Sequence, residues 1–189
     1  MSVPLLIVIV SIFVWIFPPL TKRKSRYFFF FVIMALSDPV RLLLLYTLKL
    51  NPVKLSATIV LLLLSSLVAN KNLRNILIGL SAVVTLLFVS INVPRNILLD
   101  SSCLVHFFII YVIIDSFIRQ FNENHSVNLF LVLLITYEFI AIMKYIAAIL
   151  SYEEGAISFY LATFIQIFFG ILFSFINVNT KNFSIASGR

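Results

Sequence analysis

Seven long apolar runs make up most of this chain, and only short polar segments separate them. A helix rises 1.5 Å per residue, so roughly 20 apolar residues cross a hydrocarbon core about 30 Å thick. The runs lie at about 3–20, 27–48, 55–69, 76–93, 97–118, 129–150 and 157–177, and the third is the shortest. With 62% hydrophobic residues, 11% charged residues and a mean hydropathy of +1.13, the composition is typical of an integral membrane protein.

The pattern predicts an all-α bundle of seven transmembrane helices. Glycine is scarce, at four residues, and no run alternates between apolar and polar residues as a barrel strand would. The weakest separation lies at Asn92–Asn96, so a six-helix bundle, with the fourth and fifth runs fused, is the alternative. The short linking segments leave no room for a soluble domain. We expect a single polytopic domain over residues 1–180 and a short cytoplasmic tail over residues 181–189.

The basic residues predict the orientation of the bundle. If the N-terminus lies outside, the inner segments hold Lys22, Arg23, Lys24, Arg26, Lys71, Arg74, Arg119 and Lys181. The outer segments hold Lys49, Lys54 and Arg95. This bias follows the positive-inside rule and predicts an outside N-terminus and an inside C-terminus, in a membrane such as the bacterial inner membrane. The net charge of +7 does not indicate nucleic-acid binding, because the basic residues separate apolar runs instead of forming a stripe or tail.

The two ends of the chain carry separate signals. The first run has no preceding basic region and no small-residue cleavage site, so we expect a retained helix and not a signal peptide. The final Ser187-Gly188-Arg189 is typical of a cloning linker. In that case the natural chain continues, and a fused cytoplasmic output domain becomes an expected partner.

Six polar side chains interrupt the apolar runs: Asp38, Arg41, His106, Glu138, Lys144 and Gln166. A charge at the bilayer centre costs roughly 2.5–3.5 kcal/mol on insertion scales, so each is a candidate ligand-binding residue. Counting the helical rise places Asp38, His106, Glu138 and Gln166 roughly 13–17 Å from one end of their helices. Arg41 and Lys144 fall roughly 21–23 Å from the inner face. The matching depths predict one shared intramembrane pocket.

Each of these residues also has a structural interpretation. Asp38 and Arg41 lie three apart beside Pro39, so they can form an ion pair that serves only to make the helix tolerable in lipid. Lys144 can extend its ammonium to the membrane surface. Glu138 is too short for that, and it lies six residues from Lys144, on a different helix face. We therefore predict that Glu138 faces the bundle interior, within reach of His106, Arg41 or Gln166.

Cys103 and His106 also share a helix face, three residues apart. A thiol and an imidazole can act as nucleophile and base, with Arg41 as an electrostatic stabiliser. The sequence supplies no recognisable third member, and packing with hydrogen bonds is the favoured explanation of the pair. One Cys and one His are too few for a closed metal site, and no phosphate-binding or hydrolase motif occurs, so we expect neither metal nor cofactor.

These features favour a non-enzymatic membrane module that binds a small ligand and either senses or transports it. The layout resembles, in topology alone, the seven-helix sensor modules of bacterial receptors. One alternative is a membrane-embedded Cys/His transpeptidase-like enzyme or transferase that uses Cys103, His106 and Arg41. Another is a structural or assembly subunit of a membrane complex, whose polar residues satisfy one another. The lipid bilayer is a partner in every case.

Overall fold

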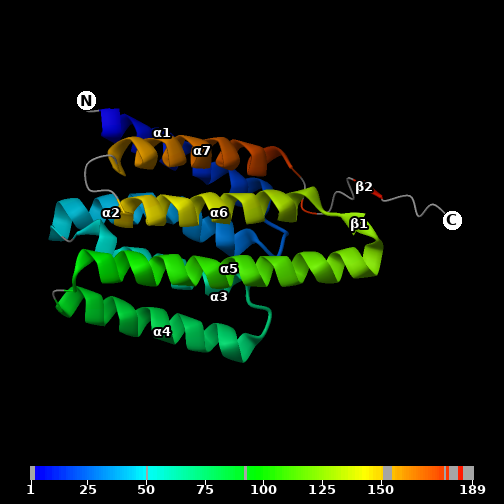
Figure 1. Ribbon diagram of the computed structural model, residues 1–189, viewed down its shortest axis with the longest axis horizontal. Coiled ribbons are helices and arrows are strands. Elements are labelled where there is room, and N and C mark those ends of the chain that lie inside the picture. Colours follow the sequence, from blue (N-terminus) through cyan, green and yellow to red (C-terminus); the bar gives the residue numbers. More distant parts are fainter. Residues whose placement is uncertain are drawn as a thin grey trace.

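The computed structural model describes residues 3–49, 51–91, 93–150, 155–176, 178, 183 and 184. Within these residues the chain forms seven α-helices that run back and forth between two ends (Figure 1). They are α1 (Val3–Thr21), α2 (Phe28–Leu48), α3 (Ser56–Leu67), α4 (Lys71–Ser90), α5 (Arg95–Asn124), α6 (Leu129–Leu150) and α7 (Gly155–Phe175). The prediction of an all-helical architecture is confirmed.

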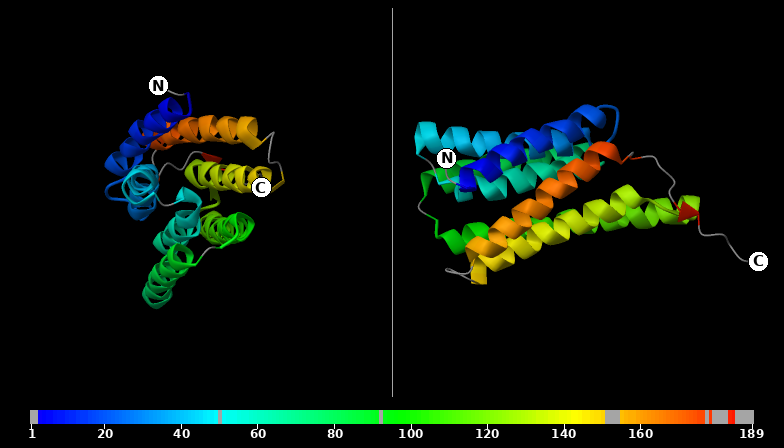
Figure 2. Two further views of the ribbon diagram at one scale, coloured as in Figure 1. Left: turned by 90° about the vertical axis from the view of Figure 1, so that its left-hand side faces the viewer. Right: turned by 90° about the horizontal axis from the view of Figure 1, so that it is seen from above.

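Six of the helices close into a ring. The neighbours around it are α1, α2, α3, α5, α6 and α7, and α7 returns to pack against α1. The remaining helix, α4, lies outside this ring and packs on α3 and on the short 3-10 turn η1 (Pro52–Leu55) (Figure 2). Only 6% of its apolar span is buried in the protein. The ring therefore holds the protein interior, and α4 is peripheral.

Aromatic side chains fill one half of the ring. Phe31, Phe130 and Phe173 are fully buried, and Trp15 and Tyr137 are 3% exposed. The Trp15 and Tyr137 rings meet edge to face at 5.4 Å, a geometry that aromatic pairs prefer. This cluster joins α1, α2, α6 and α7 and supports the polar side chains that lie next to it.

Local signals set the helix ends. The Asn70 side chain accepts hydrogen bonds from the first backbone N–H groups of α4, so that helix begins earlier than the apolar run. Pro94 precedes α5 and separates it from α4, so the fusion behind the six-helix alternative does not occur. Past its apolar run, α5 continues through a polar segment to Asn124, and His125 ends it in the left-handed conformation with φ 48°.

A two-residue antiparallel ladder, which the sequence did not indicate, joins β1 (Ser126–Val127) to β2 (Phe183–Ser184). Asn128 follows β1 and accepts a hydrogen bond from the backbone N–H of Phe130. Its amide also donates to the Gln120 side chain and to the Val178 carbonyl. These bonds tie together the end of α5, the start of α6 and the segment after α7.

Four helices are long and apolar enough to cross a membrane: Phe28–Thr47, Lys71–Ser90, Arg95–Asn124 and Leu129–Leu150. Shorter apolar helices lie at Leu6–Thr21, Val53–Leu67 and Tyr160–Phe175. Large apolar side chains such as Phe107, Phe164 and Phe168 are more than half exposed on the outer faces of their helices. Such a surface is suited to lipid. Seven crossings and their orientation stay predictions.

Candidate functional site

The most buried polar contact joins α5 to α6. The Nδ1 atom of His106 lies 2.6 Å from Oε2 of Glu138, and these residues are 5% and 0% exposed. The ring of Tyr145 lies 5.2 Å from the imidazole. The prediction that Glu138 faces the interior within reach of His106 is confirmed. We call Glu138 and His106 the carboxyl–imidazole pair.

The second contact joins α6 to α7. Nζ of Lys144 donates hydrogen bonds to Oγ1 of Thr163 and to Oε1 of Gln166, each at 3.1 Å. Lys144 thus contacts the neighbouring helix instead of extending to the membrane surface. Its neighbours differ from those of Glu138, as the six-residue spacing implied.

The third contact joins α1 to α2. Oδ1 of Asp38 lies 3.6 Å from the Arg41 guanidinium, and its Oδ2 accepts a hydrogen bond of 3.1 Å from Ser11. The intrahelical ion pair considered from the sequence is therefore present. Both side chains keep more than a quarter of their surface exposed. Nε of Arg41 is nevertheless buried, with no hydrogen-bond partner among the described residues.

Lys144 lies within electrostatic range of the Asp38–Arg41 ion pair. The charges of Arg41 and Asp38 both act on it across the bundle. We call Asp38, Arg41 and Lys144 the cationic cluster, because two of its three side chains are basic. Tyr137 lies near both this cluster and the carboxyl–imidazole pair, since the charges of Asp38, Arg41 and Glu138 all act on it. Five of the six predicted residues therefore form two nearby groups, and the sixth, Gln166, accepts a hydrogen bond from Lys144 of the cationic cluster.

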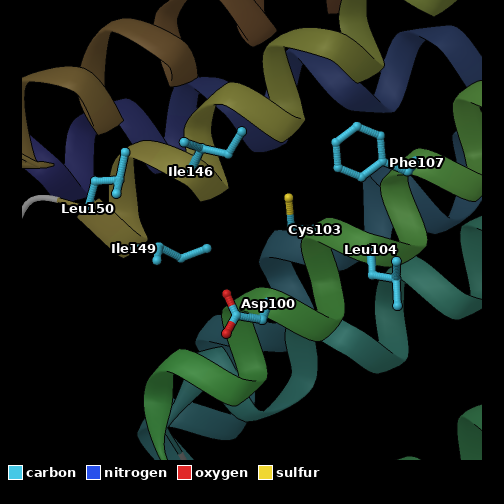
Figure 3. A pocket seen from close by; sticks show the side chains of 7 residues that line it. All are labelled: Asp100, Cys103, Leu104, Phe107, Ile146, Ile149 and Leu150. Carbon is cyan, nitrogen blue, oxygen red and sulfur yellow. The ribbon is translucent and has the colours of Figure 1, made fainter.

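Cys103 lies elsewhere. It is 8% exposed and lines an open groove of about 380 Å³ between α5 and α6. Figure 3 shows its thiol directed into that groove, which is also lined by Asp100, Leu104, Phe107, Ile146, Ile149 and Leu150. Arg41 is on α2, which packs against α1 and α3 but not against α5. The structure therefore brings Cys103 and His106 together on one helix, without Arg41.

Sequence reasoning missed three participants. Ser11 is the polar residue that interrupts the apolar α1, and that interruption could have been noticed. Tyr137 and Tyr145 resembled ordinary interfacial or core aromatics, and only the packing of α6 reveals their position. Glu138 was identified, but its role as the partner that orients His106 depended on the register between two helices.

No group of three His, Cys, Asp or Glu side chains that could hold a metal ion occurs in the part of the chain that the structure describes. Comparisons with known protein families, with curated proteins and with solved structures find no match to this chain. The functional argument therefore starts from the two polar groups and the groove.

Proposed function

We propose that all seven helices cross a bacterial plasma membrane, with the N-terminus outside and the C-terminus inside. One end of the bundle carries the α1–α2 loop, the α3–α4 loop and the end of α5, where most of the basic residues lie. Reporter fusions after Arg26, Lys49, Arg74 and Arg95 test this topology. Alternating inside and outside signals are expected, and two consecutive fusions on the same side would contradict it.

We further propose that the bundle interior binds a small anionic or zwitterionic solute at the cationic cluster, as the membrane domain of a sensor or as a transporter. The observation that carries this proposal is that two basic side chains, Arg41 and Lys144, act on each other within the bundle, beside the buried Nε of Arg41, which is unsatisfied among the described residues. Two basic side chains that repel each other among helices favour a bound anion, so a carboxylate or phosphate would be stabilised there. The unsatisfied Nε of Arg41 offers such a ligand a hydrogen-bond donor.

The carboxyl–imidazole pair has a different part in this proposal. The Oε1 atom of Glu138 is buried and has no hydrogen-bond partner among the described residues. The charge of Glu138 acts on Tyr137, and the charges of Asp38 and Arg41 in the cationic cluster act on the same side chain. Removing the Glu138 carboxylate would therefore alter the electrostatic field at the ligand. For this reason Glu138→Gln is expected to impair function more than stability.

The test uses purified protein and a panel of small carboxylates, phosphates, amino acids, amines and neutral sugars. At least one anionic or zwitterionic solute should raise the thermal unfolding midpoint in a saturable way. The shift should disappear in Arg41→Gln and Lys144→Gln and persist in Arg119→Gln, which alters an exposed cation on α5. A shift that persists in both interior variants would refute the site. Uptake of the same solute into proteoliposomes separates a transporter from a sensor.

A second candidate is a membrane-embedded enzyme that uses Cys103. The observation in its favour is that Glu138 binds Nδ1 of His106, which supplies the orienting carboxylate that the sequence alone lacked. Cys103 lies one helical turn away and opens into the groove. If His106 activates the thiol, alkylation of Cys103 by N-ethylmaleimide should slow at least tenfold in His106→Ala and in Glu138→Gln. Equal rates in all three proteins would exclude this candidate.

The third possibility is a structural subunit whose polar residues satisfy one another. It predicts that substitutions at Asp38, Glu138 and Lys144 which preserve folding also preserve the phenotype of the host. Loss of the phenotype with a folded protein would exclude it.

A further inference from the structure

The loop between α1 and α2 contains a buried lysine. Lys22 follows the last residue of α1 and is 6% exposed, whereas its neighbours Arg23 and Lys24 are exposed. Its ammonium makes no hydrogen bond or ion pair with the side chains that the structure describes. Burial lowers the pKa of Lys22 below its usual value. The aliphatic stem of Lys22 packs against the protein, and its partly desolvated ammonium has no anionic partner among the described residues.

Ser25 is a second unsatisfied group in the same loop. Its backbone N–H donates to the Lys22 carbonyl at 2.8 Å, so a tight turn brings the two residues together. The Oγ atom of Ser25 is buried and lacks a hydrogen-bond partner in the described part of the chain. A buried hydroxyl without a partner costs about 1–3 kcal/mol, so this site also favours an additional group.

The start of α2 adds to the positive potential. This helix has 21 residues, and its N-cap residue Tyr27 makes no side-chain capping bond. Helix N-termini carry a partial positive charge and attract anions. Arg26 is held against the Tyr27 ring, with its guanidinium carbon 4.7 Å from the ring centroid, so it remains at this end of the helix.

We propose that the α1–α2 loop binds a phosphate group, with the Lys22 ammonium and the Ser25 hydroxyl as its donors. The phosphate of an anionic lipid headgroup and a free phosphate share this chemistry. The loop directly precedes an apolar helix long enough to span the membrane, so a headgroup would reach it at the interface. This site is independent of the cationic cluster, which lies deeper within the helices.

The experiment titrates purified protein with dioctanoyl phosphatidic acid, with dioctanoyl phosphatidylcholine and with inorganic phosphate, and follows the thermal unfolding midpoint. The variants are Lys22→Gln and Ser25→Ala. The matched control is Lys24→Gln, which removes the same charge from an exposed position in the same loop. Lys22→Gln should weaken the apparent affinity for the phosphate ligand at least about tenfold, and Lys24→Gln by no more than about threefold.

If phosphatidic acid stabilises the protein and Lys22→Gln weakens this effect, the proposal is supported and the ligand is a lipid headgroup. If only inorganic phosphate gives this result, the proposal is supported and the ligand is a free phosphate. Equal losses in Lys22→Gln and Lys24→Gln, or no shift with either phosphate compound, would overturn it. If Lys22→Gln does not fold, Ser25→Ala decides, because it removes one donor without altering charge and should still weaken binding severalfold.

Lys22→Met gives an independent readout without any comparison of affinities. In lipid-free detergent it should raise the unfolding midpoint slightly, because it removes a partly desolvated ammonium that has no anionic partner among the described residues. With saturating phosphatidic acid the order should reverse, since only the wild type then gains the ion pair. A variant that is less stable under both conditions would contradict the site.

Discussion

The carboxyl–imidazole pair permits a quantitative prediction. A double-mutant cycle built on Glu138→Ala and His106→Ala measures how strongly the two side chains stabilise each other. The wild-type contact is short, at 2.6 Å, and almost completely buried. A hydrogen bond to a charged group contributes about 1.5–3 kcal/mol, so we expect a coupling free energy of about this size.

The single variants should differ from each other for a physical reason. Glu138→Ala removes the bond, leaves the buried imidazole without a partner and creates a cavity, so it should cost about 3–5 kcal/mol of unfolding free energy. Glu138→Gln keeps the shape of the side chain and can still pair with Nδ1 of His106. It should cost no more than about 1.5 kcal/mol.

Reversible unfolding in mixed detergent and SDS micelles gives these free energies. Trp15 is the single tryptophan of the chain and packs on Tyr137, so its fluorescence reports on the core next to the pair. The matched control is the exposed Asp115–Arg119 pair on α5, whose cycle should give only about 0.3–0.5 kcal/mol. A coupling for Glu138 and His106 as small as that of the control would refute the reasoning.

Two further predictions concern the packing at two glycines and the hydrogen bonds of Asn128. Gly170→Ala should destabilise the protein by about 1–2 kcal/mol, because the new methyl group would lie 2.8 Å from Val14 at the contact of α7 with α1. Gly79→Ala, with open space at its Cβ, should be neutral or stabilising by up to about 1 kcal/mol, and equal thermal shifts in the two variants would contradict this. Asn128→Ala should cost about 1–3 kcal/mol and speed amide exchange in the β1 segment; unchanged exchange would show that the Asn128 bonds do not hold the strand pair.

The helices were predictable because their length and apolarity are properties of local sequence. The predicted run at 129–150 coincides with α6, and that at 27–48 differs from α2 by one residue. The extension of α5 to Asn124 was not predictable, since its polar last turns resemble a loop. The peripheral position of α4 was also not predictable, because lipid and protein interior both accept an apolar helix face.

The sequence predicted how deep in the bundle the candidate site residues lie, but not which of them contact each other. Counting residues placed Glu138 and His106 at one level, and they do form a pair. The same count gave no reason to join Lys144 to Gln166, because which helices are neighbours depends on how the ring closes. Cys103 and Arg41 were grouped on chemistry alone, and the ring order places them on helices that are not in contact.

The most direct test of the interior binding site is charge-selective labelling of a thiol at Gln166. In a Cys103→Ala background, Gln166→Cys is treated with anionic and with cationic methanethiosulfonate reagents, and rates are normalised to those of Asn124→Cys at the exposed end of α5. Phe168→Cys, on the exposed face of the same helix, is the control for access from lipid. The account predicts labelling at Gln166→Cys that favours the anionic reagent, depends on Arg41 and is absent from Phe168→Cys. No labelling, or a preference for the cationic reagent, would contradict it.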